Sequence, residues 1–234
     1  MKRERLLREV GESISHIDLP HALRIGIDGI DAAGKSTFAA GLAETLFRSG
    51  VPVLWASIDD FPNPEDIRYS KGRLSPYGYY HDSFDYPVLI SRLLGPLGSS
   101  DDGANQLYPY DFQADQGRIN SALPTPEQAI LLFDGIFLSR PELTSYWDLV
   151  IFLDITFEEC LARALHRDSV RFGSAEIVRE RYLKRYIPAQ KLYLAQCQPK
   201  QRADAVINNE DPLTPELIRF DLPFYPGKFR IRSA

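Results

Sequence analysis

The residues with the clearest chemical potential lie between positions 29 and 37. Gly29, Gly34, Lys35 and Ser36 occupy the fixed positions of the pattern GxxxxGK[ST], which forms a phosphate-binding loop, or P-loop. The glycines let backbone N–H groups point at phosphate oxygens, and the start of the following helix adds partial positive charge. The lysine would neutralise the β- and γ-phosphates of ATP, and the serine hydroxyl would be a ligand of Mg²⁺; the alternative is an ordinary glycine turn before a helix. We expect the triphosphate to contact Gly29, Ala32, Ala33, Gly34, Lys35, Ser36 and Thr37.

Two carboxylates that follow apolar runs are candidates for the remaining chemistry. Asp59 follows the run 51–58, and Asp134 follows the run 129–133. In an open parallel α/β sheet, ligands bind outside the carboxyl ends of the strands. We therefore predict that Asp59 is the base for a substrate hydroxyl, with contact to the Mg²⁺ shell, and that Asp134 is a Walker-B-type metal ligand or water orienter. The alternative candidate beside Asp59 is Asp60, which could equally cap the following segment. The alternative for Asp134 is a plain turn at the end of the strand.

Basic residues gather near the end of a predicted helix that begins at Thr156 and precedes Gly173. An arginine at a transferring phosphoryl group is worth orders of magnitude in rate when it is desolvated, whereas a solvated arginine contributes little. We predict a hinged lid in which Arg167 acts in catalysis and Arg163 and Arg171 bind the nucleotide. A solvated helix face is the alternative for each.

The elements that must position these residues alternate along the chain. Short apolar runs at 23–27, 51–58, 129–133, 149–153 and 203–207 predict buried parallel strands. Helical spacing is present at 36–47, at 88–97, after 156, and at 175–196 with a kink at Pro188, and we expect a short helix within 136–146. This alternation predicts an α/β fold in three layers, a central parallel sheet flanked by helices, as in P-loop NTPases. A small lid and an aromatic insertion complete it.

Two aromatic and acidic segments are candidates for a substrate pocket. Residues 62–87 form a long insertion rich in Tyr, Pro, Gly and Asp, and residues 107–115 are again aromatic and acidic. Rings beside carboxylates suit a polar, partly aromatic small molecule. The alternative is a loop packed by its own tyrosines.

Composition narrows the functional classes. The chain has 234 residues and a net charge of −5, which suits one α/β domain and gives no general affinity for nucleic acid or membranes. No apolar run approaches the roughly 20 residues of a membrane helix, and the charged start lacks a signal-peptide core. Cys160 and Cys197 lack CxxC spacing, which favours buried thiols and the cytoplasm. Residues 2–17 predict an amphipathic helix that packs on the domain, with a partner or membrane helix as the alternative.

These segments together resemble the uridine kinase and phosphoribulokinase group of P-loop kinases over roughly residues 23–210. Residues 57–61 resemble the group's DSFY segment, which implies that Asp59 is the catalytic base. Residues 81–85 resemble HPDAFD, which implies that Asp82 holds ribose hydroxyls. Residues 109–112 are similar to PVYDF, which implies that Tyr110 and Phe112 flank the base of the substrate.

Weaker matches continue along the chain. Residues 133–136 resemble the Walker-B segment VEGI with Asp134 in place of Glu, and residues 166–168 resemble the RD of the lid. Residues 186–189 and 203–207 look like the KPA and YADVII segments. Two positions depart from the group: a His that reads the pyrimidine corresponds to Asp115, and a Gln that touches the nucleoside corresponds to Arg181. An acid reverses the hydrogen-bonding preference of that His, whereas an arginine in place of the Gln suits a more anionic acceptor. We therefore assign Asp115 and Arg181 to substrate binding with the acceptor's identity open.

The resemblance implies an ATP-dependent, Mg²⁺-requiring kinase that acts on a hydroxyl of a uridine- or cytidine-like nucleoside. Pantothenate, a sugar or a phosphorylated sugar are rival acceptors, and the competing functions are a regulatory NTPase and a catalytically silent relative. We expect an N-terminal helix at 1–20, a P-loop kinase domain at 21–212 and an irregular C-terminal extension at 213–234. The expected partner is a small molecule, and a homo-oligomer is possible.

Overall fold

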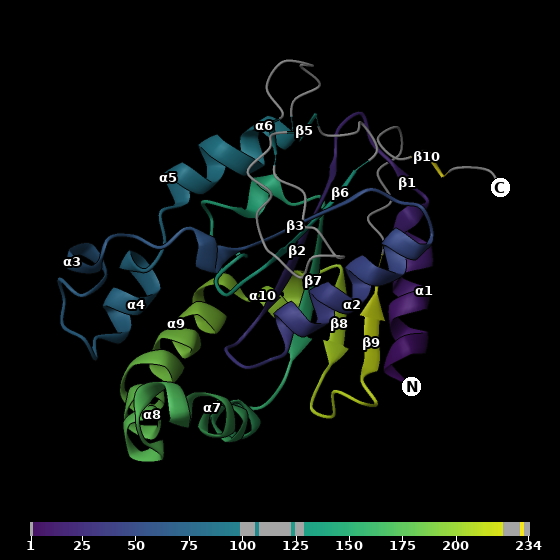
Figure 1. Cartoon of the computed structure of the whole chain (residues 1–234). Helices are drawn as coiled ribbons and strands as arrows, with labels where there is room; N and C mark the ends of the chain where they lie inside the picture. The colour runs from purple at the N-terminus through teal and green to yellow at the C-terminus, as the bar shows by residue number, and fades with distance from the viewer. Residues whose placement is uncertain (1, 99–105, 108–122, 125–128, 222–229, 232–234) are drawn as a thin grey trace.

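The structure, a computed structural model, describes residues 2–98, 106–107, 123–124, 129–221 and 230–231. Within these residues a six-stranded sheet with the order β3-β6-β2-β7-β8-β9 forms the centre of the molecule (Figure 1). All neighbouring pairs are parallel except β8 and β9. The predicted α/β fold with a central, mostly parallel sheet is confirmed. The strands are β2 (Leu23–Gly29), β3 (Val53–Ser57), β6 (Ile130–Asp134), β7 (Leu149–Asp154), β8 (Ala205–Asn208) and β9 (Glu216–Phe220).

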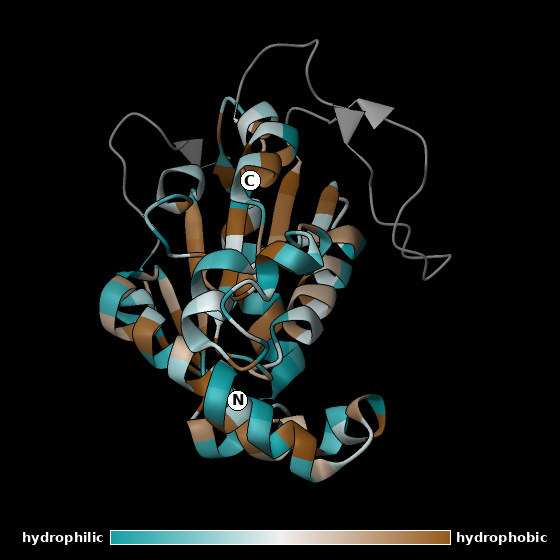
Figure 2. Cartoon of the chain, turned by 90° about the vertical axis from the view of Figure 1, so that its left-hand side faces the viewer, coloured by the Kyte–Doolittle hydropathy of each residue, from teal (hydrophilic) through white to brown (hydrophobic). Residues whose placement is uncertain are grey.

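The central strands are apolar because both faces of the sheet are covered. Every residue of β2 and β6 is buried, as is usual for a parallel sheet between helices. Figure 2 shows these strands in the colours of hydrophobic residues, enclosed by helices whose colours alternate. The continuous apolar run at 129–133, and the run at 23–27 that only Arg24 interrupts, were therefore sufficient to predict these two strands.

Helices cover the sheet on both faces (Figure 1). On one face, α1 (Arg3–Ser15) packs against α2 (Lys35–Arg48), and the apolar stripe of α1 joins the larger core cluster. On the other face, a second cluster unites α4 (Pro76–Asp82), the helix over 86–97 and α9 (Ile187–Cys197) with β3 and β6. The residues that α1 buries are Leu6, Leu7, Val10, Gly11 and Ile14.

Two helices contain a π-helical turn. The predicted helix at 88–97 is confirmed as α5 (Tyr86–Leu89), a π turn (Ile90–Leu94) and α6 (Gly95–Leu97). The predicted helix at 175–196 consists of α8 (Ala175–Arg181), a π turn (Tyr182–Tyr186) and α9. The irregular turn ends at Tyr186, two residues before Pro188, whose missing N–H and ring disfavour a regular helix.

Three segments differ from expectation. The insertion 62–87 is not irregular, because α3 (Glu65–Arg68) and α4 form within it, and the Ser75 hydroxyl caps α4 by accepting from the N–H of Gly78. Residues 136–146 form turns and a short 3₁₀ helix (Thr144–Tyr146); Phe137 has a φ of 67°, which an α-helix does not allow. The segment after 213 is also not wholly irregular, since β9 extends the sheet. The division of the chain into the segments 1–20, 21–212 and 213–234 stays a prediction.

Both cysteines are buried free thiols. None of the helices in the described part of the chain combines the length and the apolar character that a membrane crossing needs.

Candidate active site

The loop that joins β2 to α2 has the backbone of a phosphate cradle. Gly29, Ala32 and Gly34 have φ angles of 153°, 58° and 87°, and such left-handed residues turn consecutive N–H groups to one side. The Lys35 ammonium folds back across the loop and donates to the carbonyl of Ile30 at 2.8 Å. The loop therefore presents backbone donors and one cation at the carboxyl end of the central strand.

Gly29 should be the glycine least tolerant of substitution. A Cβ there would lie 2.6 Å from the carbonyl oxygen of Leu153 on the adjacent strand, which is backbone and cannot move aside. We expect Gly29→Ala to lower the free energy of unfolding by about 3 kcal/mol or more, from overpacking and a strained φ together. Urea unfolding of the unliganded protein measures this.

Gly50 provides the matched control, because its φ is 77° but a Cβ there would meet nothing within 4 Å. Gly50→Ala should cost only the backbone strain, about 1–2 kcal/mol. Equal losses in the two variants would contradict a tight fit between the loop and β7.

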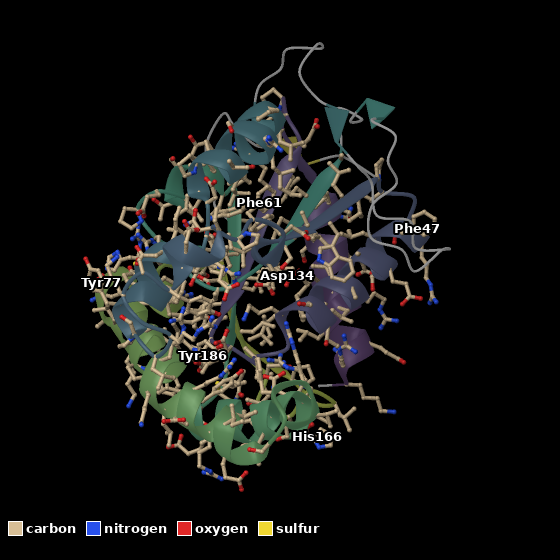
Figure 3. The ribbon with its side chains drawn as sticks, turned by 60° about the vertical axis from the view of Figure 1, so that its left-hand side comes forward. Phe47, Phe61, Tyr77, Asp134, His166 and Tyr186 are labelled. Carbon is tan, nitrogen blue, oxygen red and sulfur yellow. The ribbon has the colours of Figure 1, made fainter. Side chains whose placement is uncertain are left out.

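Asp134 lies beside the P-loop because β6 pairs in register with β2 and β3, opposite Ile27 and Ser57. Its carboxylate accepts from the Ser36 hydroxyl at 2.7 Å and from the indole N–H of Trp55 at 2.7 Å. Figure 3 places Asp134 in the middle of the molecule, at the end of its strand. The serine and the acid that were predicted to share a metal are thus in direct contact.

The donor set at this point fits Mg²⁺. Ser36 and Asp134 supply hard oxygen atoms, and Asp59 belongs to the same electrostatic neighbourhood. The described residues contain no cluster of three or more His, Cys, Asp or Glu side chains that would form a complete metal cage. A site with few protein ligands suits Mg²⁺, which keeps several waters and binds through one or two carboxylates and phosphate oxygens.

Asp59 lies in the 3₁₀ turn (Ile58–Asp60) that follows β3. Asp60 accepts from the N–H of Ser57 in a capping box, so the capping role belongs to Asp60. The Asp59 side chain remains exposed, and within the described part of the chain its carboxylate accepts no hydrogen bond. The surrounding protein removes water from it, which raises its pKa, while Lys35 opposes that shift and Asp134 adds to it.

Arg167 reaches the same neighbourhood from α7 (Phe157–Phe172). Its guanidinium pairs with the buried Asp168 at 2.8 Å and lies 3.4 Å from the Tyr182 hydroxyl, while much of the side chain remains exposed. Its charge lowers the pKa values of Asp59 and Asp31. Among the predicted lid arginines, it is the one that these interactions connect to the carboxylates.

Arg163 connects the P-loop to the turn after β8. It donates to the carbonyls of Ala32 at 3.3 Å, Asn209 at 2.8 Å and Glu210 at 3.0 Å, and it pairs with Glu159. Asn209 in turn donates to the carbonyl of Ala33 at 2.7 Å. The role of Arg163 in nucleotide binding stays a prediction. In the structure it holds the P-loop against the turn after β8.

A cavity of about 590 Å³ opens beside the loop, between α2, α7 and the turn after β8. Arg3 also lines it and donates to the carbonyl of Thr37 at 2.5 Å, so the N-terminal helix contributes to this wall. The cavity is large enough for part of a nucleotide. Its lining comprises Arg3, Ala32, Gly34, Thr37, Phe38, Glu159, Ala162, Arg163, His166, Arg167, Asn209, Pro212 and Pro215.

The predicted substrate residues are less closely grouped than the residues predicted to bind ATP and Mg²⁺. The Asp82 carboxylate forms an ion pair with Lys71. Arg171 and Arg181 both lie against the ring of Phe172, at 5.5 and 4.4 Å from its centre. Their roles stay predictions, and Tyr110, Phe112 and Asp115 lie outside the described residues.

Most of the chain matches a known protein family. Residues 24–212 match the model of the phosphoribulokinase / uridine kinase family. The chain belongs to this family. As a member of a family of P-loop kinases, it is expected to use ATP.

Individual relatives are distant. A uridine kinase from Shewanella amazonensis is 27% identical over 186 residues, which cover 78% of this chain and 85% of that protein. The structure of a possible uridine kinase from Bacillus stearothermophilus has 26% identity and a TM-score of 0.64, and the match covers 86% of this chain and 97% of that one. A D-glycerate 3-kinase from Cryptococcus neoformans has 16% identity and a TM-score of 0.57, with 92% and 97% covered, and shows similarity of fold alone.

Two residues that the structure brings to the P-loop have no role predicted from the sequence. Asp31, inside the loop, is held by Gln190 from α9 and by Tyr79 from α4. A carboxylate repels phosphate groups, so an acid within a phosphate-binding loop was a usable signal. Gln190 had none, because 159 residues separate it from Asp31.

Proposed function

We propose that the protein is an ATP-dependent kinase that transfers the γ-phosphoryl group to a hydroxyl of a nucleoside-like small molecule. The observation that carries the proposal is the common neighbourhood of Lys35, Asp59, Asp134 and Arg167. Each of the other three charges acts on the pKa of Asp59. A base and a metal-binding acid at the ends of adjacent strands, together with two cations from helices α2 and α7, are the parts that phosphoryl transfer requires.

In the proposed reaction, Asp59 accepts the proton of the acceptor hydroxyl. The hydroxyl oxygen forms a bond to the γ-phosphorus as the bond from that phosphorus to the β–γ bridging oxygen breaks, which leaves ADP. Lys35 and Arg167 stabilise the negative charge on the transferring group. Ser36 and Asp134, with Asp59 beside them, would hold Mg²⁺, which when bound neutralises phosphate charge.

The acceptor is proposed from similarity. The uridine kinases among the relatives and the resemblance at Asp59 and Asp82 favour a uridine- or cytidine-like acceptor. Pantothenate, a sugar or a phosphorylated sugar remain alternatives.

The buried free thiols of Cys160 and Cys197 suit a reducing compartment, and we infer that the protein acts in the cytoplasm.

A coupled ADP-release assay with ATP, Mg²⁺ and a panel of nucleosides, sugars and pantothenate tests the proposal. We expect ADP release that depends on one acceptor class. Hydrolysis of ATP or GTP at the same rate with and without acceptors would indicate a regulatory NTPase. Absence of turnover in a folded, ATP-binding protein would indicate a silent relative.

The pH dependence of kcat/KM should show the protonation of Asp59. Its pKa is raised above the ordinary 3.8 because the surrounding protein partly desolvates the carboxylate, and a base acts only when deprotonated. Activity should therefore be full above that raised pKa and be lost as the pH falls through it.

Arg167→Gln should move the acidic limb of the pH profile, where activity falls, to higher pH. The reason is that the positive charge of Arg167 lowers the pKa of Asp59. The slower variant can be compared with wild type because the limb position is independent of the plateau rate. A limb that stays in place, or moves to lower pH, would contradict the proximity of these two side chains.

A further inference from the structure

Asp31 is an acid held rigidly inside the phosphate-binding loop. The Nε2 of Gln190 donates to its Oδ2 at 2.8 Å, and the backbone N–H of Asp31 donates to the Oε1 of Gln190 at 3.1 Å. The hydroxyl of Tyr79 lies 3.2 Å from Oδ2 and 3.4 Å from Oδ1. Because Gln190 is fully buried, this double clamp fixes the orientation of the carboxylate.

α9 is anchored to the base of the loop at a second point. Tyr193, one helical turn after Gln190, donates to the buried carboxylate of Asp28, which also accepts from the Ser139 hydroxyl at 2.8 Å. Residues three apart share a helix face, so α9 presents Gln190 and Tyr193 to the loop together. The position of Asp31 is therefore determined by the packed core.

The hydrogen-bond donors to the Asp31 carboxylate in the described chain are neutral. Lys35 donates to a backbone carbonyl, and Arg167 pairs with Asp168, although both cations act on Asp31 through space. An ionised carboxylate offers about four acceptor positions. Oδ2 accepts from two donors, whereas Oδ1 has only the long contact from Tyr79, so Oδ1 retains capacity for a further hydroxyl.

The surroundings of Asp31 combine acids and aromatic rings. Ile27 of β2 and Ser57 of β3 both pair in register with Asp134 of β6. Asp31 and Asp59, which follow these two residues, therefore lie at the same edge of the sheet, and the charge of Asp59 acts on Asp31. The Tyr79 ring packs 5.4 Å from the ring of Phe137 and 4.7 Å from the ring of Tyr186, measured between centres. Carboxylates accept hydroxyls while ring faces cover apolar C–H surface, and two acids repel a negatively charged molecule.

We propose that Asp31 binds a second hydroxyl of the acceptor, near the hydroxyl that Asp59 deprotonates, and that the acceptor is a neutral polyol such as a nucleoside or free sugar. This inference rests on the proposed kinase function. It excludes acceptors that carry a carboxylate or a phosphate at that position.

Competing acceptors test the class. With wild-type protein, ATP and Mg²⁺, we expect kcat/KM for uridine, cytidine, D-ribose or D-fructose to exceed that for D-glycerate, pantothenate and ribulose 5-phosphate by tenfold or more. Preference for an anion would overturn the role of Asp31 and leave the kinase function standing. ADP release with none of the panel, from protein that binds ATP, would overturn the kinase proposal itself.

Deoxy analogues of the best neutral acceptor test the contact. In wild type, at least one analogue should lose about 10–100-fold in kcat/KM, the size expected for a hydrogen bond to a charged group. In Asp31→Asn that same analogue should lose less than threefold relative to the parent, because the contact is already weakened. The KM for ATP should stay within about twofold of wild type.

A uniform loss of activity for parent and analogues in Asp31→Asn would indicate a structural role and overturn the proposal. The proposal would also be overturned if every deoxy analogue had the same kcat/KM as the parent acceptor with wild-type protein. That result needs no variant. Asp154→Asn is the matched control, since Asp154 ends the neighbouring strand β7 and pairs with Lys200 at 2.6 Å. It should leave the discrimination between parent and deoxy analogue unchanged.

Discussion

Asp59→Asn is expected to lower kcat by about 10²–10⁴-fold, the range that a positioned general base contributes. The amide keeps the size of the side chain but cannot accept the hydroxyl proton. Because the described chain donates no hydrogen bond to this carboxylate, the substitution should leave the fold intact. Stopped-flow or coupled assays give kcat, and calorimetry with ATP should show a Kd within about threefold of wild type.

Asp60→Asn is the matched control for that result. The two residues are adjacent, but Asp60 caps the turn by accepting from the N–H of Ser57. Its replacement should cost up to about 1 kcal/mol of stability and little activity. If Asp59→Asn keeps more than a tenth of the wild-type kcat while Asp60→Asn does not, Asp60 is the base and the assignment to Asp59 is wrong.

Lys35→Ala should produce the second large effect, a loss of about 10²–10³-fold or more in kcat/KM. Lys35 is the cation of the P-loop, held across the loop by its bond to the Ile30 carbonyl. Its loss removes charge stabilisation of the transferring group and also the charge that lowers the pKa of Asp59. We therefore expect weaker ATP binding together with an acidic limb at higher pH.

Lys200→Ala serves as the control for removal of a lysine, because Lys200 pairs with Asp154, which has no role in the proposed reaction. It should leave kcat/KM near wild type. An unchanged ATP affinity and an unchanged limb in Lys35→Ala would contradict the placement of a triphosphate on this loop.

Much of the fold could be predicted because parallel strands between two helical layers are apolar on both faces. The runs that became β6 and β7 are apolar throughout, and the run that became β2 is interrupted only by Arg24. The meeting of Ser36 and Asp134 also followed, since the carboxyl ends of parallel strands lie at one edge of the sheet. Local rules thus led to the correct edge and to residues that do make contact there.

Other features depend on contacts between distant segments. The clamp on Asp31 joins the P-loop to Gln190 and Tyr79, and no local pattern marks a glutamine on a helix face. The 62–87 insertion did contain signals for its helices, in the Ser75 cap and the proline at the first position of α4. Its aromatic content obscured them: Tyr80 and Tyr86 are buried in the core, while Tyr77 lies exposed at the outer edge (Figure 3).

The most direct test of the central claim follows the label from [γ-³²P]ATP in the presence of Mg²⁺ and the best acceptor of the panel. The site geometry predicts that the label appears on the acceptor as a phosphomonoester, in amounts equal to the ADP formed, and that Asp59→Asn slows this transfer by about 10²–10⁴-fold. Label that appears only as inorganic phosphate, at a rate independent of the acceptor, would contradict a kinase in which Lys35 and Asp59 act on one alcohol.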